Sequence, residues 1–197
     1  MIIMSKVVII DYGAGNVKSV RFALERLGIT PELTKDHDTI LSADKVLFPG
    51  VGEARSAMAA INAAGLNELI PGLKQPVLGI CLGMQLMCEH SVERHTDGIG
   101  IFPLTVEKMT GDIKVPHMGW NQITDLKSPL FAGLDEGEYM YFVHSYYVPD
   151  SQYSIATTDY GIPYASAIQK ENFFGCQFHP EKSSDAGQLI LKNFLEL

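Results

Sequence analysis

The stretch PVLGICLGMQLMC, residues 76–88, decides the predicted fold. An apolar run ends at Gly79-Ile80-Cys81-Leu82-Gly83 and passes directly into residues suited to a helix. The spacing Gly-x-Cys-x-Gly is the thiol counterpart of a nucleophile elbow, in which flanking glycines allow a sharp turn that exposes one side chain. We therefore predict a strand over 77–80, a turn at Cys81 and a helix to about residue 90. A helix N-terminus favours a thiolate, whereas the alternative interpretation is a cysteine packed in the core.

Strand-like and helix-like stretches alternate through the first half of the chain. Apolar runs at 6–11, 29–33 and 45–48 are predicted as strands, and residues 17–27 and 53–64 as helices. This alternation is typical of βαβ units, which form a parallel sheet with helices on both faces.

Shorter apolar runs, separated by Gly, Pro and Asp turns, occupy the second half. They are predicted as antiparallel or mixed strands added to the sheet, at 104–108, 139–143, 153–158, 165–169 and 173–178. A last helix is predicted over 184–195, with Leu189, Ile190 and Phe194 toward the core. The predicted fold is a three-layer α/β fold with a mostly parallel central sheet flanked by helices and with added antiparallel strands, in a single domain over residues 1–197.

Composition limits the possible functions. The 197 residues carry a net charge of −8 and have no cluster of Lys and Arg, which argues against nucleic-acid binding. Three cysteines form neither a disulfide framework nor a zinc motif, so neither a disulfide nor a metal site is expected. The sequence shows no signal peptide and no apolar run of ~20 residues, so we expect a cytoplasmic protein that does not enter membranes. Either Met1 or Met4 could be the natural start.

The sequence His179-Pro180-Glu181 offers the base that a thiol nucleophile needs, together with a group to orient that base. Pro180 biases His179 toward extended geometry, in which residues i and i+2 point the same way. The preceding strand would end at the carboxyl edge of the sheet, where Cys81 is also expected and where open α/β sheets bind ligands. The alternative is an ordinary surface turn.

A second glycine-rich turn, Pro49-Gly50-Val51-Gly52, follows another predicted strand. Its backbone N–H groups could face a developing oxyanion, with the N–H of Leu82 as the second donor. The alternative is a plain turn into the helix at residue 53. A phosphate-binding loop is disfavoured because the turn lacks both the Gly-x-Gly-x-x-Gly pattern and the Walker lysine.

The sequences GICLGMQ (79–85), PGVG (49–52) and HPE (179–181) together resemble the class I, triad-type glutamine amidotransferase family. Four further stretches resemble more narrowly the glutaminase subunits of imidazole glycerol phosphate synthases in histidine biosynthesis. They are DYGAGN (11–16), PHMGWN (116–121), YFVHSY (141–146) and GCQFHPEKS (175–183). The resemblance extends from the first predicted strand to the last helix.

This resemblance implies a triad of Cys81 as nucleophile, His179 as general base and then acid, and Glu181 as its orienter. It implies hydrolysis of L-glutamine to glutamate and ammonia through a thioester, without a cofactor. An oxyanion hole would use the N–H groups of Val51 and Leu82. Substrate-binding residues carried over from the family are Gly52, Gln85, Glu93, His144, Ser145 and Tyr146.

The resemblance also implies a partner, a cyclase with a (β/α)₈ barrel that forms a heterodimer with this chain and uses the ammonia to make imidazole glycerol phosphate and AICAR. The residues carried over as facing that partner are Asn16, Met118, Trp120, Tyr141 and Lys182. The only tryptophan, Trp120, is expected in a loop as an interface anchor, with burial in the core as the alternative.

Three other functions stay open at the level of sequence. The chain could serve another synthase (anthranilate, GMP or pyridoxal phosphate), hydrolyse γ-glutamyl peptides without a partner, or be a non-catalytic binding protein. For the interpretation that the family resemblance favours, we expect the isolated subunit to be nearly inactive, since the glycines beside Val51 allow its peptide to flip.

Overall fold

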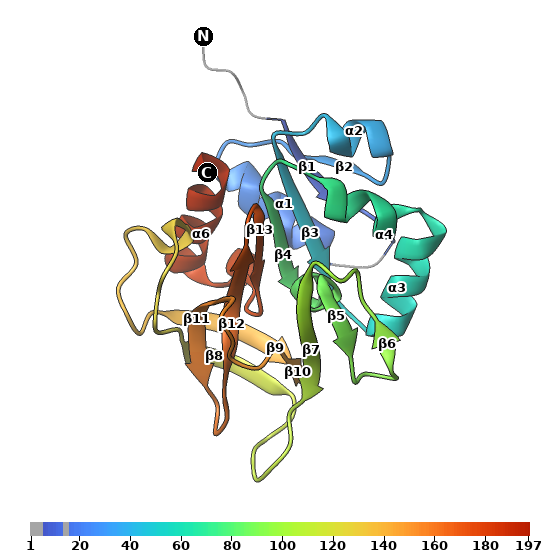
Figure 1. The fold of residues 1–197 in the computed structure, drawn as a ribbon. Helices are drawn as coiled ribbons and strands as arrows, with labels where there is room; N and C mark the ends of the chain where they lie inside the picture. Colours follow the sequence, from blue (N-terminus) through green and yellow to red (C-terminus); the bar gives the residue numbers. More distant parts are fainter. Residues whose placement is uncertain (1–5, 14–15) are drawn as a thin grey trace.

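The computed structural model describes residues 6–13 and 16–197, and its centre is a seven-stranded sheet in the order β11-β12-β13-β4-β3-β1-β2 (Figure 1). The five strands from β13 to β2 are parallel, and β12 and β11 extend the sheet antiparallel. Their bounds are β1 Val7–Ile10, β2 Glu32–Thr34, β3 Lys45–Gly50, β4 Val77–Cys81, β11 Ser154–Asp159, β12 Pro163–Lys170 and β13 Phe173–Cys176. The predicted mostly parallel sheet with added antiparallel strands is confirmed, but two of the strands predicted as added to it, at 104–108 and 139–143, lie in separate small sheets.

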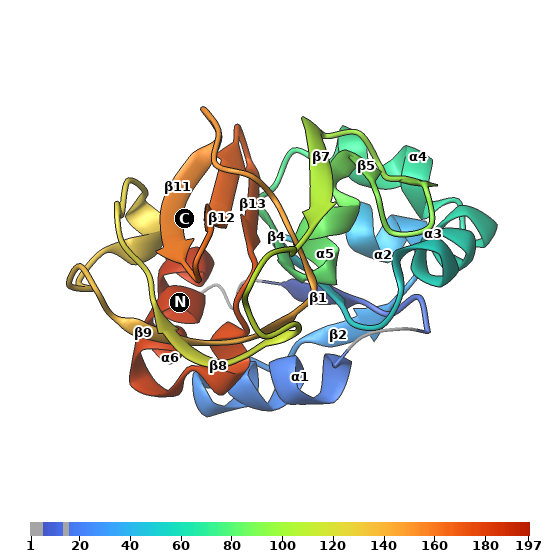
Figure 2. The same ribbon diagram turned by 90° about the horizontal axis from the view of Figure 1, so that it is seen from below.

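Helices cover both faces of this sheet (Figure 2). Successive residues of β1 point to opposite faces, so that Val8 and Ile10 pack into one core and Val7 and Ile9 into the other. The first core is closed by α2 His37–Leu41, α3 Ala54–Ala63, α4 Leu66–Leu69 and α5 Leu82–Leu86, and the second by α1 Val17–Arg26 and α6 Ser184–Glu196. Short 3₁₀ helices are η1 Ile70–Gly72, η2 Pro129–Phe131 and η3 Pro180–Lys182.

Two smaller sheets lie outside the central one. A four-stranded sheet has the order β10-β7-β5-β6, and a two-stranded ribbon pairs β8 with β9 antiparallel. Their bounds are β5 Cys88–Ser91, β6 Thr96–Asp97, β7 Phe102–Lys108, β8 His117–Gln122, β9 Tyr139–His144 and β10 Tyr146–Tyr147. The ribbon lies below the carboxyl ends of β3 and β4 in Figure 1, so it can close a site at that edge.

The helix predicted from residue 82 to about residue 90 is wrong in its second half. Helix α5 ends at Leu86, and the next residues form β5. The reason is a contact that is distant in sequence, since the backbone N–H groups of Ile99 and Ile101 donate to the carbonyls of Leu86 and Met87. Those bonds take the carbonyls that a longer helix would use.

Several other boundaries also differ from the prediction. The strand expected at 29–33 is β2 at Glu32–Thr34, because Ile29 N–H still donates to Leu24 of α1 and Pro31 has no N–H to give. The Met-Gly-Trp-Asn stretch around Trp120, expected as a loop, lies within strand β8 His117–Gln122. In α6, Leu191 is fully buried, whereas Leu189 is only half-buried.

The described residues include no helix that is both long enough and apolar enough to span a bilayer.

Candidate active site

Cys81 is the last residue of β4, the central strand of the large sheet, and it lies immediately before α5. Its backbone has φ 53° and ψ −111°, a strained conformation for a residue with a side chain. Position 83 requires glycine, because the backbone of Phe48 lies directly against it and leaves no room for a side chain. The backbone thus turns sharply at the cysteine, as in a nucleophile elbow.

The neighbours of Cys81 come from the adjacent strands on both sides of β4. Gly50, at the end of β3, is in register with Cys81, and Cys176, at the end of β13, is in register with Ile80. The chain leaves β13 toward His179, so the histidine and the turn at residues 49–52 meet the thiol at one edge of the sheet. We call that turn the oxyanion turn, after the role expected for it from the sequence. The structure brings these three segments together as the parallel topology requires.

His179 and Glu181 form a buried pair at the start of η3. The imidazole Nδ1 donates to Oε1 of Glu181 at 2.8 Å, and both side chains are almost completely shielded from solvent. The backbone N–H of His179 donates to the Tyr141 carbonyl, and its own carbonyl accepts from the hydroxyl of Ser183. These bonds fix the ring, and Nε2 has no hydrogen-bond partner among the described residues.

The protonation of His179 is set by its two partners. Burial, the largest effect, would lower the pKa of the imidazole, but the nearby Cys81 sulfur and the bond to Glu181 outweigh it and raise the pKa to about 9. At neutral pH this keeps His179 protonated, as an imidazolium beside the Cys81 sulfur. Cys88, in contrast, has no such partner, and burial raises the pKa of its thiol to about 12.

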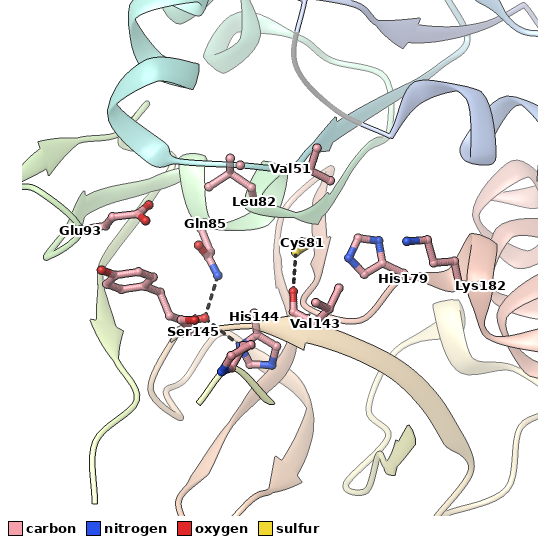
Figure 3. Close-up of a pocket in the computed structure, with 13 residues that line it drawn as sticks. Val51, Cys81, Leu82, Gln85, Glu93, Val143, His144, Ser145, His179 and Lys182 are labelled. Atoms are coloured by element: carbon pink, nitrogen blue, oxygen red, sulfur yellow. Dashed lines mark hydrogen bonds between the residues drawn. The ribbon is translucent and has the colours of Figure 1, made fainter. Parts of the chain in front are cut away.

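One cavity of about 320 Å³ joins the thiol to the residues expected to bind substrate (Figure 3). Its volume lies at the lower end of the range for small-molecule sites, roughly 300–1,000 Å³. The lining residues are Val51, Gly52, Cys81, Leu82, Gln85, Glu93, Pro116, Val143, His144, Ser145, Tyr146, His179 and Lys182. Glu181 lies behind His179 and does not line the cavity.

The oxyanion turn forms one wall of this cavity. Val51 is 39% exposed, and Gly52 has φ 98°, a conformation that favours glycine. Beneath the turn, the hydroxyl of Tyr12 donates to the Pro49 carbonyl at 3.2 Å. Burial, followed by the charge at Cys81, raises the pKa of Tyr12, which keeps this hydroxyl protonated. The turn is therefore held from below at Pro49 and is open to the cavity at Val51.

On the wall opposite the oxyanion turn, Gln85 and Glu93 present oxygen atoms to the cavity. The Gln85 amide donates both of its protons inside the protein, to the Tyr146 carbonyl at 2.8 Å and to Oε1 of Gln177 at 2.9 Å. Only its Oε1 is then left for a ligand. Glu93 accepts the N–H of Ala54, at the start of α3, with one carboxylate oxygen at 2.8 Å. Both residues can therefore accept hydrogen bonds from a cationic group.

A buried network supports the segment 144–146 from behind. Nδ1 of His144 donates to the Tyr146 carbonyl at 2.9 Å, so its Nε2 accepts from the Tyr164 hydroxyl at 3.3 Å. The same hydroxyl lies 3.1 Å from Nδ1 of His117, which must then be the donor. Burial lowers the pKa of His144 to about 3 and that of His117 to about 4, so both rings are neutral.

Four of the five residues expected to face a partner form a patch beside the cavity: Met118, Trp120, Tyr141 and Lys182. Met118 and Trp120 on β8 are 62% and 52% exposed, so the core alternative for Trp120 is wrong. The rings of Trp120 and Tyr141 pack edge to face with their centres 6.0 Å apart. Nζ of Lys182 lies 5.8 Å from the centre of the Tyr141 ring. Asn16 lies apart from this patch in sequence and begins α1, where its Oδ1 accepts from Ser19. Residues 14 and 15 of the DYGAGN motif lie outside the described residues.

Four of the groups near the thiol lie in motifs that the sequence analysis quoted but gave no role there. They are the side-chain amide of Gln177, the carbonyl of Val143, the hydroxyl of Tyr12 and the ring of Pro116. In the part of the chain that the structure describes, no group of three or more His, Cys, Asp or Glu side chains is placed to hold a metal ion.

A cysteine at the elbow of an α/β sheet, faced by a buried histidine–glutamate pair, is an arrangement suited to an enzyme that uses a thiol nucleophile. The chain belongs to the class-I glutamine amidotransferase family, since the family model described as "Glutamine amidotransferase class-I" matches residues 8–197. It is an enzyme of that family.

The chain is also similar over nearly its whole length to subunits of one particular synthase. Imidazole glycerol phosphate synthase subunit HisH of Bacteroides fragilis (strain YCH46) is 53% identical over 195 residues, 98% of this chain and 100% of that protein. The subunit of the same name from Colwellia psychrerythraea is 48% identical over 211 residues, 98% of this chain and 93% of that protein.

Solved structures share the fold at much lower sequence identity. PurLQS from Thermotoga maritima has a TM-score of 0.70 at 15% identity, covering 98% of this chain and 99% of that one. A glutamine amidotransferase from the same organism has a TM-score of 0.61 at 15% identity, covering 98% of this chain and 81% of that one.

Proposed function

We propose that this chain is the glutamine-hydrolysing subunit of an imidazole glycerol phosphate synthase and that it acts in the cytoplasm. The observation that carries the proposal is the cavity in which Cys81, the His179–Glu181 pair and the oxyanion turn meet. The relatives named as subunits of that synthase match it over 98% of its length. The PHMGWN motif, which singled out this branch of the family, lies on the ribbon that borders the cavity.

In the proposed reaction, the Cys81 sulfur attacks the side-chain amide carbon of glutamine as a thiolate beside the His179 imidazolium. The oxyanion of the tetrahedral intermediate accepts hydrogen bonds from the N–H groups of Val51 and Leu82. His179 then gives its proton to the departing ammonia, and a γ-glutamyl thioester remains on the sulfur. His179 next takes a proton from water, which attacks the thioester and releases glutamate. Glu181 holds the ring in the required tautomer through Nδ1.

Glutamine is oriented by the opposite wall of the cavity. Its α-ammonium group meets the free carboxylate oxygen of Glu93 and Oε1 of Gln85, both of which are acceptors. The Gly52 backbone and the segment from His144 to Tyr146 bind the remaining polar atoms of the substrate. Since the buried network holds that segment, the recognition surface is formed before substrate arrives.

The ammonia passes to a cyclase with a (β/α)₈ barrel, bound as a heterodimer on the exposed patch of Met118, Trp120, Tyr141 and Lys182. Exposed aromatic groups next to an active-site cavity are typical of interface anchors. We propose Asn16 as a further contact. The partner also biases the peptide at Val51 toward the orientation that donates to the oxyanion, so the isolated subunit is nearly inactive.

The test is a glutaminase assay of the wild type, Cys81→Ala and Cys88→Ala, each with and without the barrel subunit. We expect strong stimulation of the wild type and of Cys88→Ala by the partner, and no activity from Cys81→Ala. Equal activity with and without the partner would favour a stand-alone hydrolase. Stimulation only by a different synthase subunit would assign the chain to another pathway.

A further inference from the structure

The side-chain amide of Gln177 bridges the nucleophile and the substrate cavity, and the Cys–His–Glu triad does not use it. Gln177 is completely buried two residues before His179. Its Nε2 lies 3.7 Å from the Cys81 sulfur, and its Oε1 accepts from the amide of Gln85 at 2.9 Å. A buried amide with both ends engaged is a fixed dipole directed at the reacting atom.

The orientation of this amide follows from its neighbours. The Tyr146 carbonyl can only accept, so the group of Gln85 that faces it must be the NH₂. The second proton of that NH₂ points to Gln177, which must therefore present its oxygen to Gln85. The NH₂ of Gln177 is then left to face the sulfur. A flipped amide would place two NH₂ groups against each other, so the network permits one arrangement.

The sulfur consequently has two polar neighbours with opposite preferences. The Val143 carbonyl, 3.9 Å away, accepts a hydrogen bond from a thiol and repels a thiolate. The Gln177 N–H stabilises the thiolate, because a donor aimed at an anion forms a charge-assisted bond. The backbone N–H of Gln177 donates to the Ser166 carbonyl at 2.8 Å. This bond anchors Gln177 to β12 and keeps its side chain close to the sulfur.

Three other titratable groups interact with this sulfur: His179, Tyr12 just after β1, and Cys176 from β13. Glu181 lies behind His179, and Glu93, His144 and Lys182 line the same cavity. A neutral replacement of Gln177 leaves every one of these groups in place.

We propose that Gln177 holds Cys81 in its thiolate form through its side-chain N–H, and that Gln85 acts as the positioning residue that keeps this N–H directed at the sulfur. Gln85, which lines the substrate cavity, thereby affects the charge state of the Cys81 sulfur through Gln177. The proposal rests on the proposed function for its meaning in catalysis, but the effect on the thiol exists without glutamine or a partner.

The experiment measures the rate at which iodoacetamide alkylates Cys81, read from the mass of its peptide, across pH 5 to 10. It compares the wild-type chain with Gln177→Met and Gln85→Met, which keep the approximate side-chain volume and remove the amide. Gln169→Met is the matched control, since Gln169 is a partly buried glutamine on β12 that bonds Ser128, away from the cavity.

We expect the midpoint of the Gln177→Met profile to rise by about one pH unit, so that alkylation slows about tenfold at pH values well below both midpoints. The rate at high pH should be unchanged, because the thiolate itself remains equally accessible. Gln85→Met should shift the midpoint in the same direction by a smaller amount, and Gln169→Met should leave it unchanged.

Midpoints for both Gln177→Met and Gln85→Met that coincide with the wild type, in proteins with native near-ultraviolet circular dichroism, would overturn the proposal. If Gln177→Met does not fold, Gln85→Met alone decides, since it leaves Gln177 in place and removes only its orienting donor. Absence of glutaminase activity in the wild-type complex would instead refute the proposed function and leave the alkylation result intact.

Discussion

Replacement of Gly83 by alanine tests whether the oxyanion turn and the nucleophile are held at a fixed distance by backbone contact. An ideal Cβ at Gly83 would lie 1.8 Å from the Phe48 carbonyl oxygen. Real Cβ atoms essentially never approach closer than 3.0 Å, so the end of β3 would have to move by about 1.2 Å. Because Phe48 leads directly into Pro49-Gly50-Val51, this movement carries the oxyanion turn away from Cys81.

Two effects should follow from Gly83→Ala. Overpacking between β3 and α5 should destabilise the protein by about 1–3 kcal/mol. Displacement of the Val51 donor should lower kcat for glutamine hydrolysis in the complex by roughly 10²–10³-fold, the usual cost of losing one oxyanion donor. Glu93 and the segment from His144 to Tyr146 lie on neither β3 nor α5, so KM should change less than kcat.

The measurements are steady-state glutaminase kinetics of the complex and urea unfolding of the isolated subunit. Gly72→Ala is the matched control, since a Cβ there meets nothing within 4 Å and its backbone is not left-handed. A Gly83→Ala enzyme with kcat within threefold of the wild type would refute the idea that this contact sets the position of the oxyanion turn.

Three other predictions concern separate parts of the site. The folded pKa of His144 lies at about 3, below its ordinary value near 6.5, so the unfolded chain binds the extra proton. This ring alone then lowers wild-type stability by roughly 1.4 kcal/mol per pH unit below pH 6.5. Between pH 6.5 and 5, His144→Gln should therefore lose about 2 kcal/mol less than the wild type in urea unfolding, and equal losses would contradict the buried neutral ring. Glu93→Gln keeps an acceptor for Ala54 but removes the charge, so KM for glutamine should rise at least about tenfold with little change in kcat; an unchanged KM would remove Glu93 from substrate binding. Trp120→Ala should weaken binding to the barrel subunit by about 30-fold or more, measured by calorimetry, and change the free energy of unfolding by less than about 0.5 kcal/mol; undiminished affinity would place the interface elsewhere.

The meeting of Cys81, His179 and the oxyanion turn could be predicted because it depends only on local signals and one general rule. Runs of apolar residues identified the buried strands, and glycines and prolines indicated where each strand ended. Parallel strands in one sheet bring those ends to the same edge. Nearly a hundred residues separate the thiol from the imidazole, yet β4 and β13 are neighbours, with Ile80 in register with Cys176.

The features that sequence reasoning missed depend on contacts between distant segments. Strand β5 replaces the second half of a predicted helix because residues 99 and 101 bond to the end of α5. The orientation of Gln177 requires the Tyr146 carbonyl, which lies on another strand. The tautomers of His117 and His144 depend on a shared hydroxyl from Tyr164. No local pattern of residues encodes these pairings, so they emerge only from the folded chain.

The most direct test of the central claim is the mass of the protein during turnover. The complex is mixed with glutamine, quenched in acid within one turnover and digested, and each cysteine-containing peptide is weighed. We predict a γ-glutamyl adduct on Cys81 in the wild type, lost when hydroxylamine cleaves the thioester and absent from Cys81→Ala. Ammonia release without any adduct on Cys81, or with the adduct on Cys88 or Cys176, would contradict the proposed role of Cys81.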